Sequence, residues 1–236
     1  MKDKLNLENL FCSLEITGEK KFDNASEEIK AELKHEIKDL GKWSKTRGRR
    51  LPATLSRNEC KALMTAHKKG KLAFRNNLII RVLYASGIRV DELAELKFCD
   101  IFYDEQTIFV RSGKGDKDRY TCVDSETLEF LRKWQGDKDL RESVFGLSRR
   151  QLRRIVEKAG DITGISAKFD AMDRVFSCHS LRHAFATHCY ENGLRVPTLR
   201  MLLGHEHLGT TMLYLYTAKK YHVKEYCEYH PLENNE

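Results

Sequence analysis

The residues best able to do chemistry in this chain are gathered between Cys178 and Tyr216. This segment contains His179 and Arg182, then His205, and then Tyr214. Imidazoles can move protons, a guanidinium can bind an anion, and a phenol can act as a nucleophile. Together these are the groups needed to attack a phosphodiester without a metal ion.

Helical geometry, with about 100° of rotation per residue, sorts the side chains that follow Cys178 onto two sides. One side is expected to be polar and to hold His179, Arg182, His183 and Ala186. The other is expected to face the core and to hold Leu181, Ala184, Phe185 and His188. His188 is therefore predicted to be a hydrogen-bonded core histidine. For His183, a structural hydrogen bond and a catalytic role remain equally open.

A zinc site is the main alternative for this segment, because its cysteines and histidines are dense. The potential ligands are Cys178, His179, His183, His188 and Cys189. Zinc sites usually combine paired ligands from two separate knuckles, or use an H-E-x-x-H helix. The segment shows neither pattern, so we predict no metal and no other cofactor.

Composition bounds the class of protein. The chain has 236 residues, of which 41% are hydrophobic and 33% charged, and its net charge is +7. A basic chain of this kind is either an ordinary soluble protein or a partner of a polyanion such as nucleic acid. Its seven cysteines form no C-x-x-C pair, and no apolar run resembles a signal peptide or a membrane span. We therefore expect a cytoplasmic, nucleoid-associated protein with reduced and mostly buried cysteines.

The elements that must position these residues are predicted to be mainly helical, with one small antiparallel β-hairpin. A capping box of Ser56 and Glu59 indicates the start of one helix. Further helices are expected over 72–86, from Ile88 to Leu96, from Asp124 to about Trp134, and from Ser148 to about Lys158. Strands are expected over 107–111 and 119–123 around a glycine-rich turn that carries Lys114, and residues 160–176 are expected to be irregular.

The first fifty residues carry weaker signals. Residues 25–40 have the apolar spacing of one amphipathic helix. Residues 42–50 contain five cationic side chains and Trp43. That stretch is either a solvated linker or a strap along nucleic-acid phosphates.

Taken together, the motifs carry more information than any one of them. In chain order they are Gly-Ile-Arg-x-x-Glu-Leu, Gly-Lys-Gly-x-Lys, His-x-Leu-Arg-His, Leu-Leu-Gly-His and Thr-Thr-x-x-Tyr. From about Leu51 to Thr217 the chain resembles the catalytic domain of the tyrosine recombinase family, which includes phage integrases and Xer-like proteins. The resemblance implies the catalytic set Arg89, Lys114, His179, Arg182, His205 and Tyr214.

The resemblance also implies roles for several members of this set. Arg89 and Arg182 would bind the scissile phosphate, with Glu92 helping to order the site. Lys114, rather than the less favoured Lys117, would be the hairpin lysine. Tyr214 would be the nucleophile, because its spacing from the preceding motifs fits better than that of Tyr216.

The implied activity is site-specific cleavage and rejoining of double-stranded DNA through a 3′-phosphotyrosyl intermediate, with neither metal nor ATP. An integrase of a mobile element or a Xer-like resolvase would do this as a homo-oligomer of two to four chains, with an accessory DNA-binding protein as a further expected partner. The alternatives are a type IB topoisomerase-like enzyme, a non-catalytic DNA-binding module of the same fold, and a metal-dependent nuclease.

The chain departs from the family before the catalytic region. Family members usually carry a helical core-binding domain there, and residues 1–50 are too few for it. We therefore expect an appendage and basic linker over 1–50, a catalytic domain over 51–217 and a tail over 218–236. The tail is predicted to form a short amphipathic helix over 219–229 that docks on a neighbouring subunit, with packing on its own subunit as the alternative.

Overall fold

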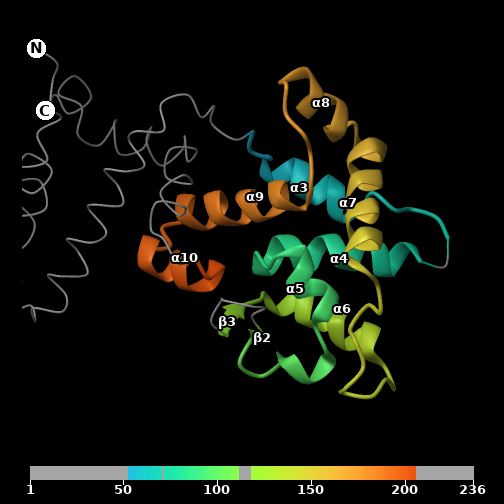
Figure 1. Cartoon of the computed structure of the whole chain (residues 1–236), viewed down its shortest axis with the longest axis vertical. Helices are drawn as coiled ribbons and strands as arrows, with labels where there is room; N and C mark the ends of the chain where they lie inside the picture. The colour runs from blue at the N-terminus through green and yellow to red at the C-terminus, as the bar shows by residue number, and fades with distance from the viewer. Residues whose placement is uncertain (1–52, 71, 112–117, 206–236) are drawn as a thin grey trace, which may run out of the picture. The chain divides into compact units, whose positions relative to one another are not determined.

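The computed structural model describes residues 53–70, 72–111 and 118–205 (Figure 1). Helices dominate this part of the chain, and a small antiparallel sheet accompanies them, which confirms the predicted fold class. The helices are α3 (Arg57–Met64), α4 (Ala73–Ser86), α5 (Val90–Glu95), α6 (Ser125–Gln135), α7 (Arg149–Thr163), α8 (Ile165–Ala171), α9 (Cys178–Glu191) and α10 (Val196–Leu203). The remaining elements are the 3₁₀ turn η1 (Phe98–Asp100) and strands β1 (Ile101–Phe102), β2 (Thr107–Val110) and β3 (Arg119–Cys122).

Local side-chain chemistry sets where several helices begin. At α3, Ser56 Oγ accepts from the Glu59 amide at 3.2 Å, and Glu59 accepts from the Ser56 amide at 2.8 Å. Asp124 caps α6 by accepting from the Thr127 amide at 3.0 Å. These bonds satisfy amide groups that have no partner within the first helical turn. The predicted starts of α3 and α6 are therefore confirmed.

The sheet has the strand order β1-β2-β3, and both pairs of neighbours are antiparallel. The hairpin of β2 and β3 was predicted, whereas the short β1 was not. Ile108 pairs with Thr121, and both side chains are buried. The next pair, Phe109 and Tyr120, lies on the opposite face, and Tyr120 is 55% exposed. Alternate residues of β3 therefore point into the protein and out to solvent.

The hydrophobic core is built around α4 and α9, which lie side by side (Figure 1). Helix α4 buries Leu78, Ile79, Ile80, Val82 and Leu83, which makes it a central helix of the core. A second, smaller apolar cluster joins α9 to α10. Its buried members are Phe185, Ala186, Leu199 and Leu203. This cluster fixes the position of α10 and of the residues that follow it.

Gly87 makes the turn between α4 and α5 possible. Its φ of +64° is left-handed, and a Cβ there would lie 2.3 Å from the ring of Phe185 on α9. Only glycine combines that backbone conformation with such a close approach. The turn therefore brings the start of α5 against α9.

Two parts of the fold correct the sequence predictions. Residues 160–171 are not irregular, because α7 continues to Thr163 and α8 spans Ile165–Ala171, whereas 172–176 lie in no helix or strand, as predicted. Gly160 does not end α7. A Cβ at Gly160 would lie 2.4 Å from the ring of Phe176, so the glycine permits close packing there. This tertiary contact cannot be read from the local pattern.

The second correction concerns the cysteines. All five described cysteines are free thiols, but only Cys60 and Cys178 are buried. Cys99 is exposed in η1, and Cys122 is exposed on the outer face of β3. The prediction of mostly buried thiols is therefore wrong for these two, because a turn and an edge strand each leave one side open to solvent.

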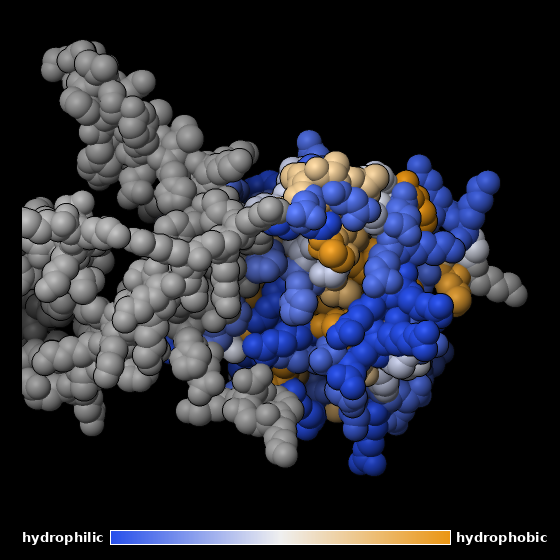
Figure 2. Space-filling model, turned by 45° about the horizontal axis from the view of Figure 1, so that its top comes forward, coloured by the Kyte–Doolittle hydropathy of each residue, from blue (hydrophilic) through white to orange (hydrophobic). Residues whose placement is uncertain are grey.

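The surface is largely hydrophilic on the face drawn in Figure 2, where hydrophobic residues show as separate patches. Within the described ranges, every helix is too short or too polar to cross a membrane. The predicted helix over 25–40, the basic stretch over 42–50 and the tail over 219–229 lie outside the described residues.

Candidate active site

Arg89 lies at the start of α5, directly after the Gly87 turn. Its amide donates to Glu92 Oε2 at 2.6 Å, and its Nη1 donates to Glu92 Oε1 at 3.0 Å. The side chain of Arg89 is 31% exposed, whereas that of Glu92 is 9% exposed. Glu92 therefore orients a guanidinium that still faces solvent.

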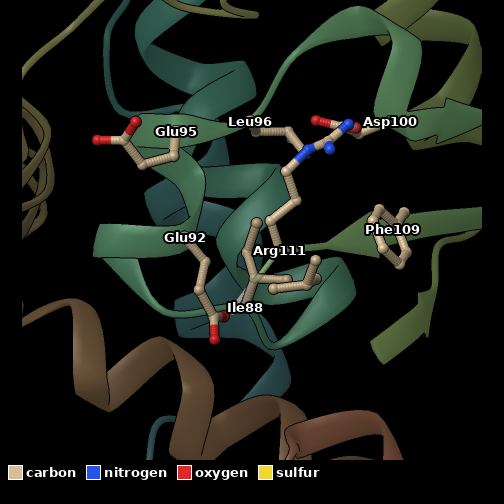
Figure 3. A pocket seen from close by; sticks show the side chains of 8 residues that line it. Ile88, Glu92, Glu95, Leu96, Asp100, Phe109 and Arg111 are labelled. Carbon is tan, nitrogen blue, oxygen red and sulfur yellow. Dashed lines mark hydrogen bonds and ion pairs between the residues drawn. The ribbon is translucent and has the colours of Figure 1, made fainter. Parts of the chain in front are cut away.

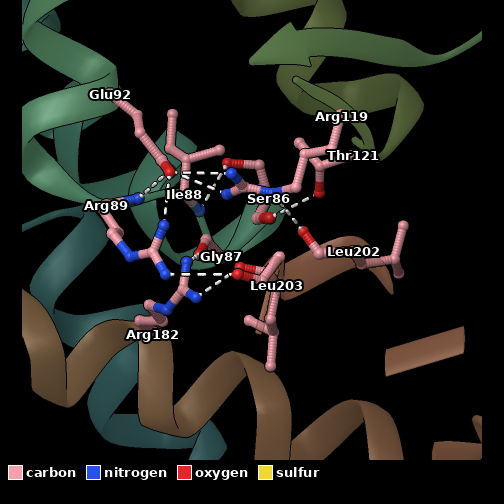
Figure 4. Close-up of polar contacts among 11 residues, drawn as sticks. Ser86, Gly87, Ile88, Arg89, Glu92, Arg119, Thr121, Arg182, Leu202 and Leu203 are labelled. Atoms are coloured by element: carbon pink, nitrogen blue, oxygen red, sulfur yellow. Dashed lines mark hydrogen bonds and ion pairs between the residues drawn. The ribbon is translucent and has the colours of Figure 1, made fainter. Parts of the chain in front are cut away.

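Arg182 comes from α9 and is 5% exposed. Its Nη1 donates to the Gly87 carbonyl and its Nη2 to the Leu203 carbonyl, both at 2.6 Å. A buried guanidinium requires acceptors of this kind, because burial without them would be costly. Arg182 therefore ties the turn before Arg89 to the end of α10 (Figure 4).

The buried state of Arg182 corrects the prediction of a polar side on α9. Ala186 on that side is fully buried as well, while His179 is exposed. The side is covered because α10 and the Gly87 turn pack against it. Helical periodicity correctly identified the core side, where Leu181, Ala184, Phe185 and His188 are buried.

The C-terminal end of α10 gathers three arginines. Three successive carbonyl oxygens there each accept a hydrogen bond from a different guanidinium. The acceptors and donors are Leu202 with Arg119 at 3.0 Å, Leu203 with Arg182 at 2.6 Å and Gly204 with Arg89 at 3.4 Å. The end of a helix carries unsatisfied carbonyls and a partial negative charge, both of which favour cations. The three guanidinium groups come from β3, α9 and the start of α5, so α10 unites distant segments.

Arg119 is the member of this group that the sequence prediction missed. Its Nη1 and Nη2 donate to the two carboxylate oxygens of Glu92, each at 2.8 Å, and both side chains are 9% exposed. One signal in the sequence could have identified it. Arg119 shares a strand face with Thr121, which points inward, and an inward arginine needs a carboxylate partner.

His205 follows α10 and lies among these cations. Burial lowers its pKa most, and the charges of Arg182, Arg89 and then Arg119 add to this effect, so that the pKa falls to about 3. The backbone of His205 is held by Arg200, whose carbonyl accepts from the His205 amide at 3.2 Å. At neutral pH the imidazole is therefore uncharged.

His179 occupies the first turn of α9 and is more exposed. Partial burial is still the first cause that lowers its pKa, followed by the charges of Arg182, Arg153 and Arg89. A neutral imidazole at neutral pH can accept a proton. The structure thus brings His179, His205, Arg89 and Arg182 into one electrostatic environment.

The other two histidines of α9 differ from each other. His188 is 7% exposed, and its Nδ1 lies 2.8 Å from the hydroxyl of Tyr84, which confirms the predicted core histidine. His183 has its pKa lowered to about 4, first by burial and then by His179 and Arg182. It lies next to the cationic cluster, and its role stays open.

The alternative zinc site finds no ligand set in the described ranges. No group of three or more His, Cys, Asp or Glu side chains there is arranged to hold a metal ion. Lys114, Lys117, Tyr214 and Tyr216 lie outside the described residues, so the structure does not place the predicted lysine or nucleophile.

This arrangement is suited to an anion. Three guanidinium groups meet at the end of α10, two neutral imidazoles feel their charge, and the carboxylate of Glu92 is shared by Arg89 and Arg119. Planar guanidinium groups match the oxygens of a phosphate and stay charged at any working pH. The site can therefore bind a phosphate and stabilise additional negative charge on its oxygens.

Comparison with known proteins places this geometry in a family. The model of the phage integrase family matches residues 53–221. The chain is 35% identical over 188 residues to the tyrosine recombinase XerA of Pyrococcus furiosus, covering 75% of this chain and 62% of the relative. It is 31% identical over 201 residues to the tyrosine recombinase XerD of Ralstonia nicotianae, covering 77% of this chain and 61% of the relative. The chain thus spans about three fifths of the length of these relatives.

Solved structures agree with this assignment. A crystal structure of XerA recombinase superposes with a TM-score of 0.65 and 28% identity, over 79% of this chain and 66% of that one. A post-cleavage complex of the XerH site-specific recombinase with its palindromic difH substrate has a TM-score of 0.62 and 25% identity, over 78% of this chain and 55% of that one. With the motifs, the fold and the family model in agreement, the chain belongs to the phage integrase family.

Proposed function

We propose that this chain is a site-specific DNA recombinase or integrase that cleaves and rejoins double-stranded DNA through a 3′-phosphotyrosyl intermediate. The observation that carries the proposal is the convergence of Arg89, Arg182 and His205 on the end of α10. The names of the relatives, which are tyrosine recombinases, support the same reaction.

In the proposed reaction, Arg89 and Arg182 bind the non-bridging oxygens of the scissile phosphate. Attack adds negative charge to these oxygens, so the charge-assisted hydrogen bonds strengthen in the transition state. His205 donates to one of these oxygens. Its pKa rises when the anionic phosphate arrives, since an opposite charge favours the protonated form of an imidazole.

The proton and bond changes balance without a cofactor. The Tyr214 phenol attacks phosphorus and passes its proton to His179, which is neutral before the reaction. The bond from phosphorus to the 5′ oxygen breaks, and Lys114 protonates that oxygen as it leaves. The 3′-phosphotyrosyl ester conserves the energy of the bond, so attack by another 5′-hydroxyl rejoins the strand.

We also propose the assembly in which this occurs. A homo-oligomer of two to four chains acts on DNA, with the catalytic domain over 51–217 and the tail over 218–236 docking on a neighbouring subunit. We also propose that an accessory DNA-binding protein takes part in this assembly. The expected setting is a mobile element or dimer resolution in the cytoplasm, at the nucleoid.

The decisive experiment traps the covalent intermediate. The full chain is incubated in EDTA with a pool of nicked duplexes of randomised sequence, in which cleavage near the nick releases a short strand and prevents rejoining. We expect a protein–DNA adduct that resists denaturation, and peptide mass spectrometry should locate it on Tyr214. Tyr214→Phe should abolish the adduct, while the matched control Tyr216→Phe should retain it.

Other outcomes separate the alternatives. An adduct formed by Tyr214→Phe would reassign the nucleophile, and DNA cleavage that requires a metal ion would favour a nuclease. Relaxation of supercoiled plasmid without sequence preference would favour a topoisomerase-like activity. Binding without any adduct would leave a non-catalytic DNA-binding module.

A further inference from the structure

Arg119 occupies a particular position in the chain. It is the first residue of β3 and follows the turn segment that contains Lys114 by a few residues. Because it alternates with the exposed Tyr120, its side chain points inward with Thr121. The strand that follows the segment containing Lys114 thus delivers a guanidinium into the interior.

That guanidinium joins two other elements (Figure 4). Its Nη1 and Nη2 bind both oxygens of Glu92 on α5, and its Nε donates to the Leu202 carbonyl on α10 at 3.0 Å. The backbone at Gly204 presses against it, since a Cβ there would lie 2.7 Å from Arg119 Cδ. One side chain therefore contacts the segments that carry Arg89 and His205.

Glu92 is shared between two arginines. Oε1 accepts from Arg89 Nη1 at 3.0 Å and from Arg119 Nη1 at 2.8 Å. Burial alone would raise the pKa of Glu92, but the hydrogen bonds and charge of Arg119, followed by those of Arg89, bring it below its ordinary value. Loss of Arg119 would leave a buried carboxylate with Arg89 as its remaining guanidinium partner among those described.

We propose that Arg119 is a positioning residue that holds Glu92, and through it Arg89, in register with the end of α10. The proposal rests on the proposed recombinase function of the same site. The proposal makes the first residue of β3, the strand that follows Lys114 in the chain, a structural partner of the arginines proposed to bind phosphate. A displacement of β3 is transmitted to Arg89 through Glu92 and to His205 through Leu202 and Gly204.

The test compares Arg119→Met and Arg119→Lys with the wild-type chain on the nicked duplex that gives the trapped adduct. Arg119→Met should lower the cleavage rate constant at saturating DNA by on the order of 10–100-fold, because small displacements of positioning groups have effects of that size. The dissociation constant for the uncleaved duplex should change by less than about threefold, since Arg119 is not itself expected to contact DNA. Arg119→Lys should recover only part of the rate, because an ammonium lacks the fork that binds both oxygens and Leu202 together.

Arg111 offers a matched control at the other side of the same turn. It follows β2, and its guanidinium forms an ion pair with the buried Asp100, whereas Glu92 points away from it (Figure 3). Asp100 also accepts from the Lys97 amide at 3.1 Å, so it keeps a donor when Arg111 is lost. Arg111→Met removes an ion pair between a more exposed arginine and a buried carboxylate outside the Glu92 cluster, and should cleave at the wild-type rate.

The pH profile distinguishes positioning from a loss of stability. In Arg119→Met the pKa of Glu92 should rise, because burial is no longer offset by two guanidinium groups. The acid limb of the rate profile should then move to higher pH. Adding Glu92→Gln should remove that shift, since an amide does not titrate in this range.

A second readout needs no cleavage. Hydrogen exchange of the Gly204 and His205 amides, which donate to Met201 at 3.1 Å and to Arg200 at 3.2 Å, should become on the order of tenfold faster in DNA-free Arg119→Met. Arg111→Met should leave these two amides unchanged.

The outcomes separate this inference from the proposed function. If the wild-type chain forms no Tyr214 adduct, the proposed function is refuted. The hydrogen exchange of the Gly204 and His205 amides in Arg119→Met then decides whether Arg119 has the positioning role. If the wild-type chain cleaves DNA and Arg119→Met has the same cleavage rate, pH profile and hydrogen exchange as the wild type, the inference is overturned but the proposed function is not. An equal loss of rate in Arg111→Met would also overturn it, because the effect would not be specific to the Glu92 pair.

Discussion

At the scale of single residues, three arginines donate to carbonyls at the end of α10. They differ in exposure and therefore in what they can do. Arg89 is 31% exposed, Arg119 is 9% exposed by side chain, and Arg182 is 5% exposed. Arg89 is the one best placed to meet a ligand, Arg182 links two backbone segments, and Arg119 holds Glu92. Arginine alone suits all three positions, since each side chain serves more than one acceptor at fixed geometry.

His205 supports a prediction about pH and stability. Its folded pKa is about 3, below the ordinary histidine value of about 6.5. Between these values the unfolded chain binds a proton that the folded chain does not, so stability present above pH 6.5 is lost as the pH falls. From pH 7 to 5 the wild type should lose about 1–2 kcal/mol more free energy of unfolding than His205→Asn, measured by urea denaturation.

The comparison of the two proteins provides its own control. Above pH 7 their stability curves should run parallel, because His205 is uncharged in both the folded and unfolded states there. Equal losses between pH 7 and 5 would show that His205 takes up its proton as readily in the folded protein as in the unfolded chain.

At the scale of elements, the site depends on how α10 ends. Gly204 adopts a left-handed φ of +62°, which turns the chain and exposes the last carbonyls of the helix. The apolar cluster of α9 and α10 fixes the helix, so these carbonyls stand at a defined place. The position of His205 then follows from the end of the helix, where Arg200 accepts from the His205 amide and donates to its carbonyl, each at 3.2 Å.

Gly204→Ala tests this dependence, with Gly146→Ala as a matched control. Gly146 has a similar φ of +59°, but no atom lies within 4 Å of an added Cβ, whereas at Gly204 the Arg119 side chain lies at 2.7 Å. Both changes should cost about 1 kcal/mol for the left-handed backbone. Gly204→Ala should cost about 1–3 kcal/mol more from overpacking, measured by urea denaturation.

Activity should separate the two glycines as well. Gly204→Ala is expected to slow adduct formation strongly, and Gly146→Ala is expected to leave it unchanged. Equal stabilities for the two variants would mean that Arg119 moves aside at little cost, which would weaken its assignment as a fixed partner of Glu92.

At the scale of the whole molecule, the charge of the chain fits the proposed DNA partner. In the proposed function, the net charge of +7 would provide long-range attraction to DNA, and the site would recognise one phosphate. The relatives extend beyond the part that this chain matches. We therefore expect residues outside the described ranges to contribute to the proposed assembly on DNA.

Deletion of 218–236 tests the proposed docking of the tail. Tyr221, Val223 and Tyr226 are the expected apolar contacts. The truncated chain should keep its thermal stability and its binding to a single duplex, but should form fewer multi-subunit complexes in native gels with DNA. A loss of thermal stability without a change in assembly would indicate that the tail packs on its own subunit.

Much of the local structure was predictable from neighbouring residues. Ser56 with Glu59, and Asp124 before α6, marked helix starts, since a cap acts within one turn. The hairpin was predictable because its strands flank a glycine-rich turn. The length of α7 was not, because Gly160 serves a contact with Phe176 that lies far along the chain.

The sequence by itself determined the order of the motifs, the family, and the identity of Arg89, His179, Arg182 and His205 as candidates, because residue type and spacing are local properties. Only the tertiary structure decided that three arginines meet on successive carbonyls of α10, that one of them is Arg119, and that Arg182 is buried. The physical reason is that each of these facts depends on contacts between segments far apart in the chain. Such contacts are selected by the packing of α4, α9 and α10, and leave no periodic signal in the residues that make them.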